Sequence, residues 1–372
     1  MRIREIIEAL ENFSPLSYQD DYDNSGLQLG LTDVKLTGVL LCLDVTEAVI
    51  EEAANKGCNL IVSHHPLLFK GLKKITADDY VGRCVMKAIR CGITVYAAHT
   101  NLDNAYGGVS YGLAGLLGLK DTRPLASLPG EMLKLVIYVP ASHSEKLREA
   151  LFAAGCGATL RYDSCSYSLN GGTGTFRPLD DARPYAGHIG EMYSSEETRL
   201  EMILPRCRRG DALKAIYSAH PYEEPAYEFT SLENDFSAQT GNGSGVIGDI
   251  DEMPVDDFLR KVSDAVGAGC LRHSRFSKDC VTRVAICGGA GSFLIPRAVS
   301  MGADAFLTGE IKHHEFLGRE HEILLIEAGH YETEQHAKGI FRAIISDVLS
   351  ERGVADVHVF EYTDDNPIKY FR

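Results

Sequence analysis

The sequence predicts an α/β protein whose two pseudo-symmetric halves form one core and are interrupted by an α+β insert. Short apolar runs without polar alternation recur at 38–43, 59–62, 283–287 and 323–326, which is typical of strands buried on both faces of a parallel sheet. Helical segments separate these runs at both ends of the chain, in the alternating order of an α/β sheet. The middle of the chain breaks this order, because glycine and serine are frequent there.

The first half, residues 1–124, is expected to place a histidine pair at the end of a central strand. The run 59–62 leads into Ser63-His64-His65-Pro66. Pro66 cannot donate to a sheet ladder, so strand pairing should stop there. The elements predicted in this half are, in order, a helix ending before Pro15, a turn at 21–30, strand 36–43, helix 45–56, strand 59–62, helix 80–90 and strand 93–97.

Residues 125–247 are expected to form the insert, and residues 248–372 the second half of the core. Within the insert, the glycine run at 170–174 predicts a flexible or turning loop, and 241–245 has the composition of a linker. The other elements predicted after residue 124 are strands at 133–139, 199–204, 283–287 and 323–326 and helices at 142–154 and 209–219.

Charge and composition narrow the classes of partner and location. The formal net charge of −15 argues against nucleic acid as a general partner and against anionic membrane surfaces. No run of about 18 apolar residues is present, so we expect no membrane span, and the N-terminus lacks the apolar core of a signal peptide. The ten cysteines include no C-x-x-C pair, which favours reduced core thiols in a cytoplasmic protein.

The two halves carry the same pattern of polar residues after their strands. Residues 63–65 (Ser-His-His) correspond to 308–314, which end in His313-His314, and 98–103 (Ala-His-x-x-x-Asp) correspond to 329–334 (Gly-His-x-x-x-Glu). An internal duplication explains both matches. It predicts a pseudo-two-fold relation between the halves, with a shared site between them.

Five of these side chains indicate a pair of divalent metal ions. Open α/β sheets build their sites at the carboxyl ends of strands, which is where His64 and His65 lie. Adjacent side chains on a strand point to opposite faces, so these two histidines could bind at two nearby points in space. His330 and Glu334 would share one helix face, and the two carboxylate oxygens of Glu334 could bridge two ions. The predicted ligands are His64, His65, Asp103, His330 and Glu334. Nitrogen and oxygen donors without sulfur suit zinc first, with manganese or ferrous iron as alternatives.

Each signal also has a purely structural explanation. Two histidines at a strand end can bond to loop carbonyls, and Glu334 is favoured at a helix N-terminus by the helix dipole. The coincidence of the signals favours the metal centre. We expect His99, Glu310, His313 and His314 near it, with His99 and His314 as candidate catalytic proton shuttles, since histidine titrates near neutral pH. The loop 288–292 either holds a phosphate or is a tight turn without a ligand.

Taken together, the motifs resemble the dinuclear metal-centre family named after a yeast NGG-interacting factor and known as GTP cyclohydrolase I type 2-like. The matching segments are Asp23-Asn24-x-Gly26-Leu27, His64-His65-Pro66, His99-Thr100-x-Leu102-Asp103, Thr308-Gly309-Glu310-x-x-His313-His314 and Gly329-His330-x-x-x-Glu334. The resemblance implies a binuclear centre, with the predicted ligands at the family's positions, and a ring-shaped homohexamer whose metals face an internal cavity. One departure is Tyr22, where members often carry Trp.

The insert has a resemblance of its own, to the PII-like and divalent-cation-tolerance (CutA-like) fold. It lies in the run 135–140, a helix ending at Gly155-Cys156, and His220-Pro221-Tyr222-Glu223. It implies a ferredoxin-like α+β module that trimerises in those relatives and would cap or stiffen the assembly. A second metal site at His220 and Glu223 is the alternative to a structural role, in which prolines shape entry into an edge strand.

The sequence therefore predicts a metal-dependent hydrolase that acts on a small-molecule substrate, a nucleotide or another phosphate ester. Two adjacent ions would lower the pKa of a water between them and stabilise the opposing oxygen of the substrate. The alternative is a non-catalytic, metal-loaded assembly for metal storage, chaperoning or regulatory binding. The absence of an unmistakable catalytic base from the sequence supports this second hypothesis.

Overall fold

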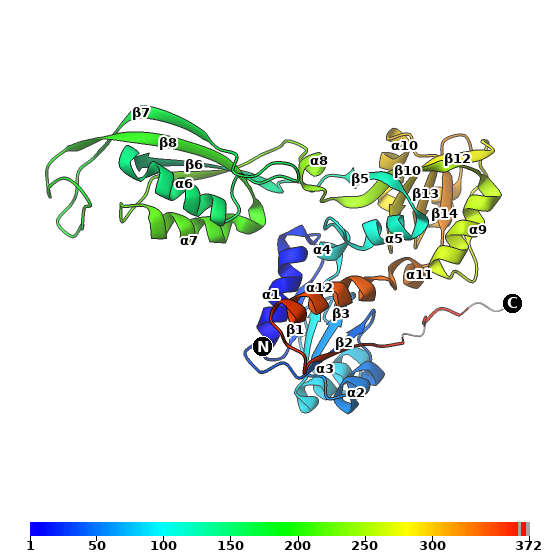
Figure 1. Ribbon diagram of the computed structural model, residues 1–372. Helices are drawn as coiled ribbons and strands as arrows, with labels where there is room; N and C mark the ends of the chain where they lie inside the picture. The colour runs from blue at the N-terminus through cyan, green and yellow to red at the C-terminus, as the bar shows by residue number, and fades with distance from the viewer. Residues whose placement is uncertain (364–365, 370–372) are drawn as a thin grey trace. The chain divides into compact units, whose positions relative to one another are not determined.

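The computed structural model describes residues 1–363 and 366–369 (Figure 1). The chain forms two compact units. The core unit comprises residues 1–127 and 241–372, and the insert unit comprises residues 128–240. All ten cysteines are free thiols. None of the helices in the described ranges combines the length and apolar character that a membrane-spanning helix requires.

The first sheet of the core unit has the apolar central strands that the sequence predicts. Its spatial order is β1 (Gly26–Leu29), β4 (Thr94–Ala97), β3 (Leu60–Ser63), β2 (Gly38–Cys42) and β15 (His358–Glu361). All neighbours are parallel except β1, which runs antiparallel to β4. Every residue of β2, β3 and β4 is buried, because side chains from each face pack beneath helices.

Four helices cover this sheet. Helices α2 (Glu47–Asn55) and α3 (Tyr80–Cys91) pack on the face of Leu40 and Ile61. Helices α1 (Ile3–Phe13) and α12 (Ala337–Glu351) pack on the opposite face. Local chemistry sets their ends: the Asp79 carboxylate accepts from the Gly82 N–H at the start of α3, and Gly92 ends it at φ +64°.

The second sheet of the core unit has six strands. In spatial order they are β11 (Arg272–His273), β14 (Leu324–Glu327), β13 (Ala305–Thr308), β12 (Cys280–Cys287), β10 (Ser244–Pro254) and β5 (Lys120–Ala126). Strands β12, β13 and β14 are parallel neighbours, whereas β11, β10 and β5 pair in antiparallel fashion. The helices on its two faces are α5 (Val109–Leu117) and α9 (Val255–Val266) on one, and α10 (Ile295–Ser300) on the other.

Two helices cross between the sequence halves. Helix α5 follows the strands of the first sheet in sequence but packs on the second sheet, against Val246 of β10 and Phe258 of α9. Helix α12 follows the strands of the second sheet but packs on the first, where Phe341 is buried against Val39 and Tyr96. The exchange, visible in Figure 1, joins both sheets into one unit. It also brings the short helices α4 (Thr100–Asp103) and α11 (His330–Glu334) close together, because both contact α5.

The insert unit is a four-stranded antiparallel sheet with two helices on one face. Its strands, in spatial order, are β7 (Tyr167–Phe176), β8 (Tyr193–Pro205), β6 (Met132–Pro140) and β9 (Tyr227–Ser231). Its helices are α6 (Ser144–Ala153) and α7 (Arg209–Ala219), which pack on the sheet, and the short α8 (Ser237–Thr240).

The predicted loop at 170–174 is wrong, since these residues lie inside β7. The strand bulges between Leu169 and Gly172 and then pairs with β8 through Gly172 and Gly174. A Cβ atom on Gly174 would lie 2.3 Å from the carboxyl carbon of Glu197. Glycine serves here for close approach to a side chain rather than for flexibility.

Candidate metal centre

The histidine pair extends from the carboxyl end of β3, as the apolar run and Pro66 predict. The backbone N–H groups of His64 and His65 still donate to Cys42 and Leu43, at 3.2 and 3.0 Å. The Ser63 hydroxyl donates to the carbonyl of His65 at 2.8 Å. These bonds fix the backbone of both histidines, so their side chains leave a central strand at defined positions.

The second contribution comes from the turn between β14 and α11. Gly329 makes this turn at φ +100°, a backbone conformation that residues with a side chain rarely adopt, so glycine is favoured here. Helix α11 then places His330 and Glu334 one turn apart, with the His330 Nε2 atom 3.1 Å from the Glu334 Oε2 atom. The predicted i, i+4 pair is therefore formed on a helix.

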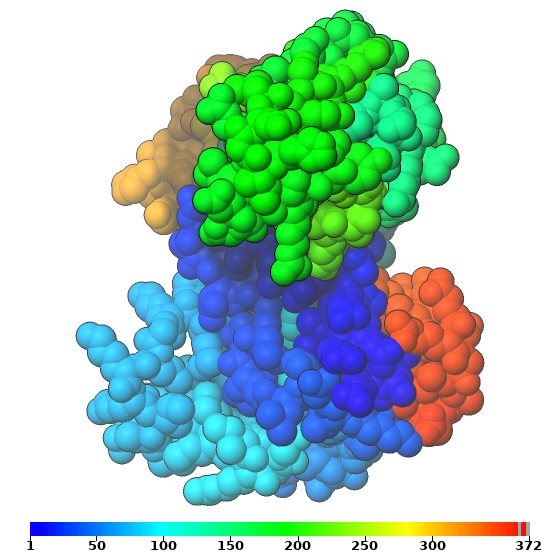
Figure 2. Space-filling model, turned by 90° about the vertical axis from the view of Figure 1, so that its left-hand side faces the viewer, coloured from blue at the N-terminus to red at the C-terminus, as the bar shows by residue number. Residues whose placement is uncertain are grey.

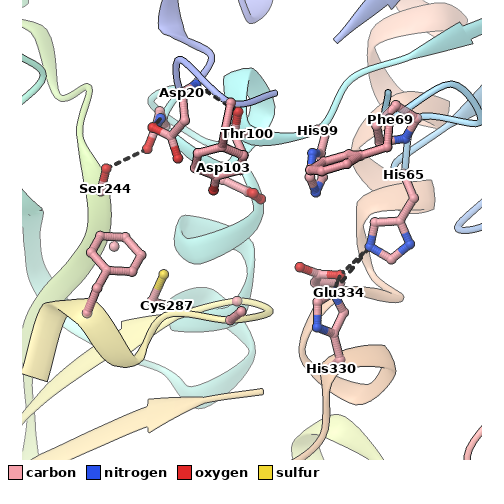
Figure 3. Close-up of a pocket in the computed structure, with 17 residues that line it drawn as sticks. Asp20, His65, Phe69, His99, Thr100, Asp103, Ser244, Cys287, His330 and Glu334 are labelled. Carbon is pink, nitrogen blue, oxygen red and sulfur yellow. Dashed lines mark hydrogen bonds and ion pairs between the residues drawn. The ribbon is translucent and has the colours of Figure 1, made fainter. Parts of the chain in front are cut away.

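The structure brings the five predicted ligands together around one side chain, and Figure 3 shows His65, Asp103 and His330 beside it. This side chain is the buried carboxylate of Glu334. Its Oε2 atom lies 2.9 Å from the Nε2 atom of His65. Its Oε1 atom lies 3.7 Å from the Nε2 atom of His64, which is itself 3.6 Å from Oδ1 of Asp103. His65 and His330 approach to 3.3 Å between their Nε2 atoms. The two oxygens of Glu334 thus face different histidines.

Each of the three imidazoles is oriented through its Nδ1 atom. The Nδ1 of His64 lies 2.8 Å from the carbonyl of Ala98, and a carbonyl only accepts, so this nitrogen carries the proton. The Nδ1 of His65 bonds to Asp44 at 2.8 Å. The Nδ1 of His330 bonds to Glu310 at 2.9 Å. All three rings therefore turn Nε2 toward Glu334, the arrangement that outer partners give metal-binding histidines.

Two atoms of this cluster are buried with no hydrogen-bond partner among the described residues: Nε2 of His64 and Oδ1 of Asp103. An unsatisfied buried polar group costs about 1–3 kcal/mol. A tetrahedral ion with bonds of about 2.0–2.1 Å holds its ligand atoms about 3.3 Å apart. The separations within the cluster are close to this value, and one atom each from His64, His65 and Glu334 fall within 4.8 Å of one another. The residues present therefore fit a metal ion.

The electrostatics of the protein alone also favour a cation. Burial and the charge of Glu334 raise the pKa of the Asp103 carboxyl well above its usual range. Burial lowers the pKa of His64, which keeps this imidazole neutral and able to bind a metal. Burial would also lower the pKa of His65, but the carboxylates of Asp44 and Glu334 outweigh it and raise this pKa to about 10. A bound ion would replace the proton that these carboxylates hold on His65.

A cavity of about 380 Å³ opens beside the cluster and is lined by His65, Asp103, His330 and Glu334. His99 lines it as well, and its ring lies 5.4 and 5.5 Å from those of His64 and His65. The Nδ1 of His99 bonds to Asp23 at 2.8 Å. His99 is thus placed near the centre, as expected from the sequence.

His314 lies elsewhere. It is exposed on the 3₁₀ helix His313–Phe316, where its ring contacts that of His313. Of the described residues that line the cavity, none is His314 or its exposed neighbour His313. The reason is its offset: His64 follows β3 directly, whereas Gly309 and Glu310 follow β13, and His314 comes later. Glu310 reaches the centre instead, through His330.

The glycine loop after β12 forms a tight turn. The N–H groups of Gly289 and Gly291 donate to the hydroxyls of Thr333 and Thr308, at 3.1 and 2.9 Å, so neither is available for a phosphate. A Cβ on Gly289 would lie 2.1 Å from Oε1 of Glu334. The loop therefore makes room for this carboxylate.

Three acidic residues support the centre; sequence reasoning expected Glu310 near it, named Asp23 only as part of a family motif and missed Asp44. Asp44 and Glu310 orient His65 and His330. Asp23 accepts from His99 and from the N–H and hydroxyl of Thr100. Burial would raise the pKa of Asp23, but these bonds lower it overall. Asp44 follows the strand next to β3, so its position at the same sheet edge was a usable signal.

Comparison with known proteins identifies the family. The family model of Duf34/NIF3 (NGG1p interacting factor 3) matches residues 1–367. A Bacillus subtilis protein named "GTP cyclohydrolase 1 type 2 homolog" is 36% identical over 374 residues, covering 99% of this chain and 98% of the relative. A homologue of the same name from Halalkalibacterium halodurans is 38% identical, covering 83% and 82%.

Solved structures support the same family assignment. A Bacillus cereus protein related to NIF3 superposes with a TM-score of 0.84 at 34% identity, covering 100% of this chain and 99% of the other. A Staphylococcus aureus protein superposes with a TM-score of 0.76 at 28% identity, with the same coverage. With its mixed α/β fold and a histidine–glutamate cluster able to hold a metal ion, the chain belongs to the Duf34/NIF3 family.

Proposed function

We propose that this protein is a metal-dependent hydrolase that uses two divalent ions per chain to act on a nucleotide or another phosphate ester. The observation that carries the proposal is the position of Glu334, whose oxygens face different histidines at 3.7 and 2.9 Å. One ion would be held by His64, Asp103 and one oxygen of Glu334. The other would be held by His65, His330 and the second oxygen.

The two positions differ in chemistry. The first offers one imidazole and two carboxylates. The second offers two imidazoles and one carboxylate, and Asp44 and Glu310 stand behind its imidazoles. Imidazole-rich positions suit zinc and iron, whereas carboxylates also suit manganese. Zinc remains our first candidate for both.

The remaining residues would position the substrate and move protons. When bound, two ions would lower the pKa of a water between them and stabilise negative charge on the substrate. Asp23 fixes the proton of His99 at Nδ1. The Nε2 atom of His99 is then the acceptor, so this histidine would take a proton from a group in the cavity and return it to the leaving group.

We also propose that the core arose by duplication of two halves, 1–124 and 248–372. Each sheet contains three adjacent parallel strands, β2-β3-β4 and β12-β13-β14. In each, the third strand leads into a short helix, α4 or α11, that carries a carboxylate of the cluster. The insert, predicted at 125–247, contains the compact unit 128–240, which has the β-α-β-β-α-β order of a ferredoxin-like module. The homohexamer and the cytoplasmic location stay predictions from the sequence.

Turnover by the metal-loaded protein tests the proposed activity. We expect multiple turnovers of at least one member of a panel of nucleoside phosphates and phosphodiesters. His64→Ala should lose the ion held by His64 and Asp103, and turnover with it, whereas the control His321→Ala, at an exposed position, should keep both ions and turnover. The proposed hydrolase activity is refuted if the protein with both ions bound turns over no compound of the panel. It is also refuted if His64→Ala loses metal but hydrolyses the panel as wild type does. Metal transfer to another protein without turnover would favour the storage or chaperone alternative.

A further inference from the structure

A cavity of about 1100 Å³ lies within the insert unit and is lined by two sequence motifs that the metal centre does not use. One is the glycine run at 170–174, which follows β7. The other is His220-Pro221-Tyr222-Glu223, of which Tyr222 and Glu223 line the cavity. The segment that joins β7 to β8 lines another side, and it lies in the green part of the insert unit that faces the viewer in Figure 2. We call this space the insert cavity.

Three aromatic rings form a continuous wall of the insert cavity. The Tyr222 ring lies 5.4 Å from that of Phe176 and 6.3 Å from that of Tyr185, at interplanar angles of 65° and 48°. All three side chains line the cavity, and Tyr185 is 56% exposed. Rings inclined in this way present their surfaces in different directions. Because the face of an aromatic ring carries partial negative charge, such a wall attracts a cation.

A carboxylate adds negative charge beside this wall. The hydroxyls of Tyr222 and Ser195 both donate to Oε1 of Glu197 at 3.1 Å, which fixes the carboxylate next to the Tyr222 side chain. Among the described residues no ion pair neutralises Glu197, since Arg199 on the same strand pairs with Glu201 instead, at 2.8 Å. The charge of Glu197 is therefore available to a ligand.

Local contacts hold the ring and the carboxylate in place. His220 accepts from the backbone N–H of Tyr222 through Nδ1 at 3.1 Å, and its Nε2 donates to the carbonyl of Tyr138 at 2.9 Å. Both nitrogens are thus used inside the unit, which favours a structural role of His220 over a second metal site. A Cβ on Gly174 would lie 2.3 Å from the carboxyl carbon of Glu197, so glycine makes room for this side chain.

The charges around the insert cavity favour an organic cation. Carboxylates outnumber guanidinium groups in its lining, which contains Asp181, Glu197, Glu223 and Glu224 against Arg177 and Arg199. Among the described residues of the insert unit, no three metal-ligating side chains lie close enough together to hold an ion. A bare ammonium ion is strongly hydrated, whereas an alkylated one has apolar groups that gain contact with aromatic rings.

We propose that the insert cavity binds a small molecule with a quaternary ammonium group, which lies against Phe176, Tyr185 and Tyr222 with its charge facing Glu197. The proposal is independent of the hydrolase, because every lining residue belongs to the insert unit. The cavity is larger than such a head group requires, so the remainder of the molecule would extend along the glycines of β7.

Binding of choline to the full chain tests the proposal. The matched control ligand is the uncharged alcohol in which a tert-butyl group replaces the trimethylammonium group, since the two have nearly the same shape. We expect choline to bind at least about tenfold more tightly, and Tyr185→Ala to weaken it by about 2- to 30-fold, the range of one cation–π contact. Glu197→Gln should remove most of the preference for choline over the alcohol. Tyr162→Ala, which removes an exposed ring outside the cavity, should change neither ligand.

The proposal is wrong if the chain binds the two ligands equally or binds neither. It is also wrong if choline binds but neither Tyr185→Ala nor Glu197→Gln weakens it, because the site is then elsewhere. Removing the metal should leave choline binding unchanged, and its loss would place the ligand at the metal centre instead. If Tyr185→Ala changes the oligomeric mass in solution without changing choline affinity, the aromatic wall is a subunit interface and the proposal falls.

Discussion

Glu334→Gln is expected to lose both metal ions at once. The side chain lies between the two proposed ion positions, within 3.7 Å of His64 and 2.9 Å of His65. Glutamine keeps the shape but replaces one ligating oxygen by an amide nitrogen and removes the charge. Mutating a residue that only hydrogen-bonds to a metal ligand lowers metal affinity by about 10–100-fold. Because Glu334 would be a ligand itself, we expect more than a 100-fold loss of affinity. Metal content after dialysis measures it, and added metal should raise the melting temperature of the wild type only.

Two substitutions serve as controls for this loss. Glu332→Gln changes a buried carboxylate on the same helix, which bonds to Asn366 at 2.9 Å and faces away from the cluster, and it should keep both ions. Asp103→Asn should keep one ion, at the His65 and His330 position. If Glu334→Gln retained two ions with wild-type affinity, the bridging role would be refuted.

Gly289→Ala is expected to abolish metal binding without touching any ligand. A Cβ at this position would lie 2.1 Å from Oε1 of Glu334 and 3.4 Å from Cε1 of His330, so the carboxylate must move away. The residue also has φ +58°, and the left-handed conformation costs a non-glycine residue about 1–2 kcal/mol. Chelator competition gives the metal affinity, and urea unfolding of the metal-free protein gives the stability.

Gly267→Ala separates the collision from the backbone strain. Gly267 ends α9 at φ +66°, and a Cβ there would meet nothing within 4 Å. This variant should lose a similar amount of stability but bind metal normally. Equal metal affinity in the two variants would show that the Gly289 turn does not make room for the ligand.

The regular elements were predictable because their apolar runs are unambiguous. The strand predicted at 59–62 is β3, one residue later at each end. Helix α7 spans 209–219 as predicted. The histidine pair was placed at the end of β3 by Pro66, and the i, i+4 spacing placed His330 beside Glu334. In each case the prediction depends on residues close together in the chain, so it can be made from a single sequence.

What failed or was missed depends on partners distant in sequence or, for His314, on an offset of a few residues from a strand end. The apolar face of α12 shows that it packs, but not that it packs on the first sheet, more than two hundred residues earlier in sequence. The glycines of β7 predict a loop from sequence alone, because the close approach of Glu197 to Gly174 is visible only in the structure. His314 matched a repeat, yet its offset from the strand end takes it away from the cavity.

The most direct test of the account is anomalous diffraction from crystals of the protein purified without chelator, recorded at the absorption edge of the metal found in it. We predict two peaks on either side of the Glu334 carboxylate, one in contact with His64 and Asp103 and the other with His65 and His330. A single peak, or metal bound only away from Glu334, would contradict a two-ion centre.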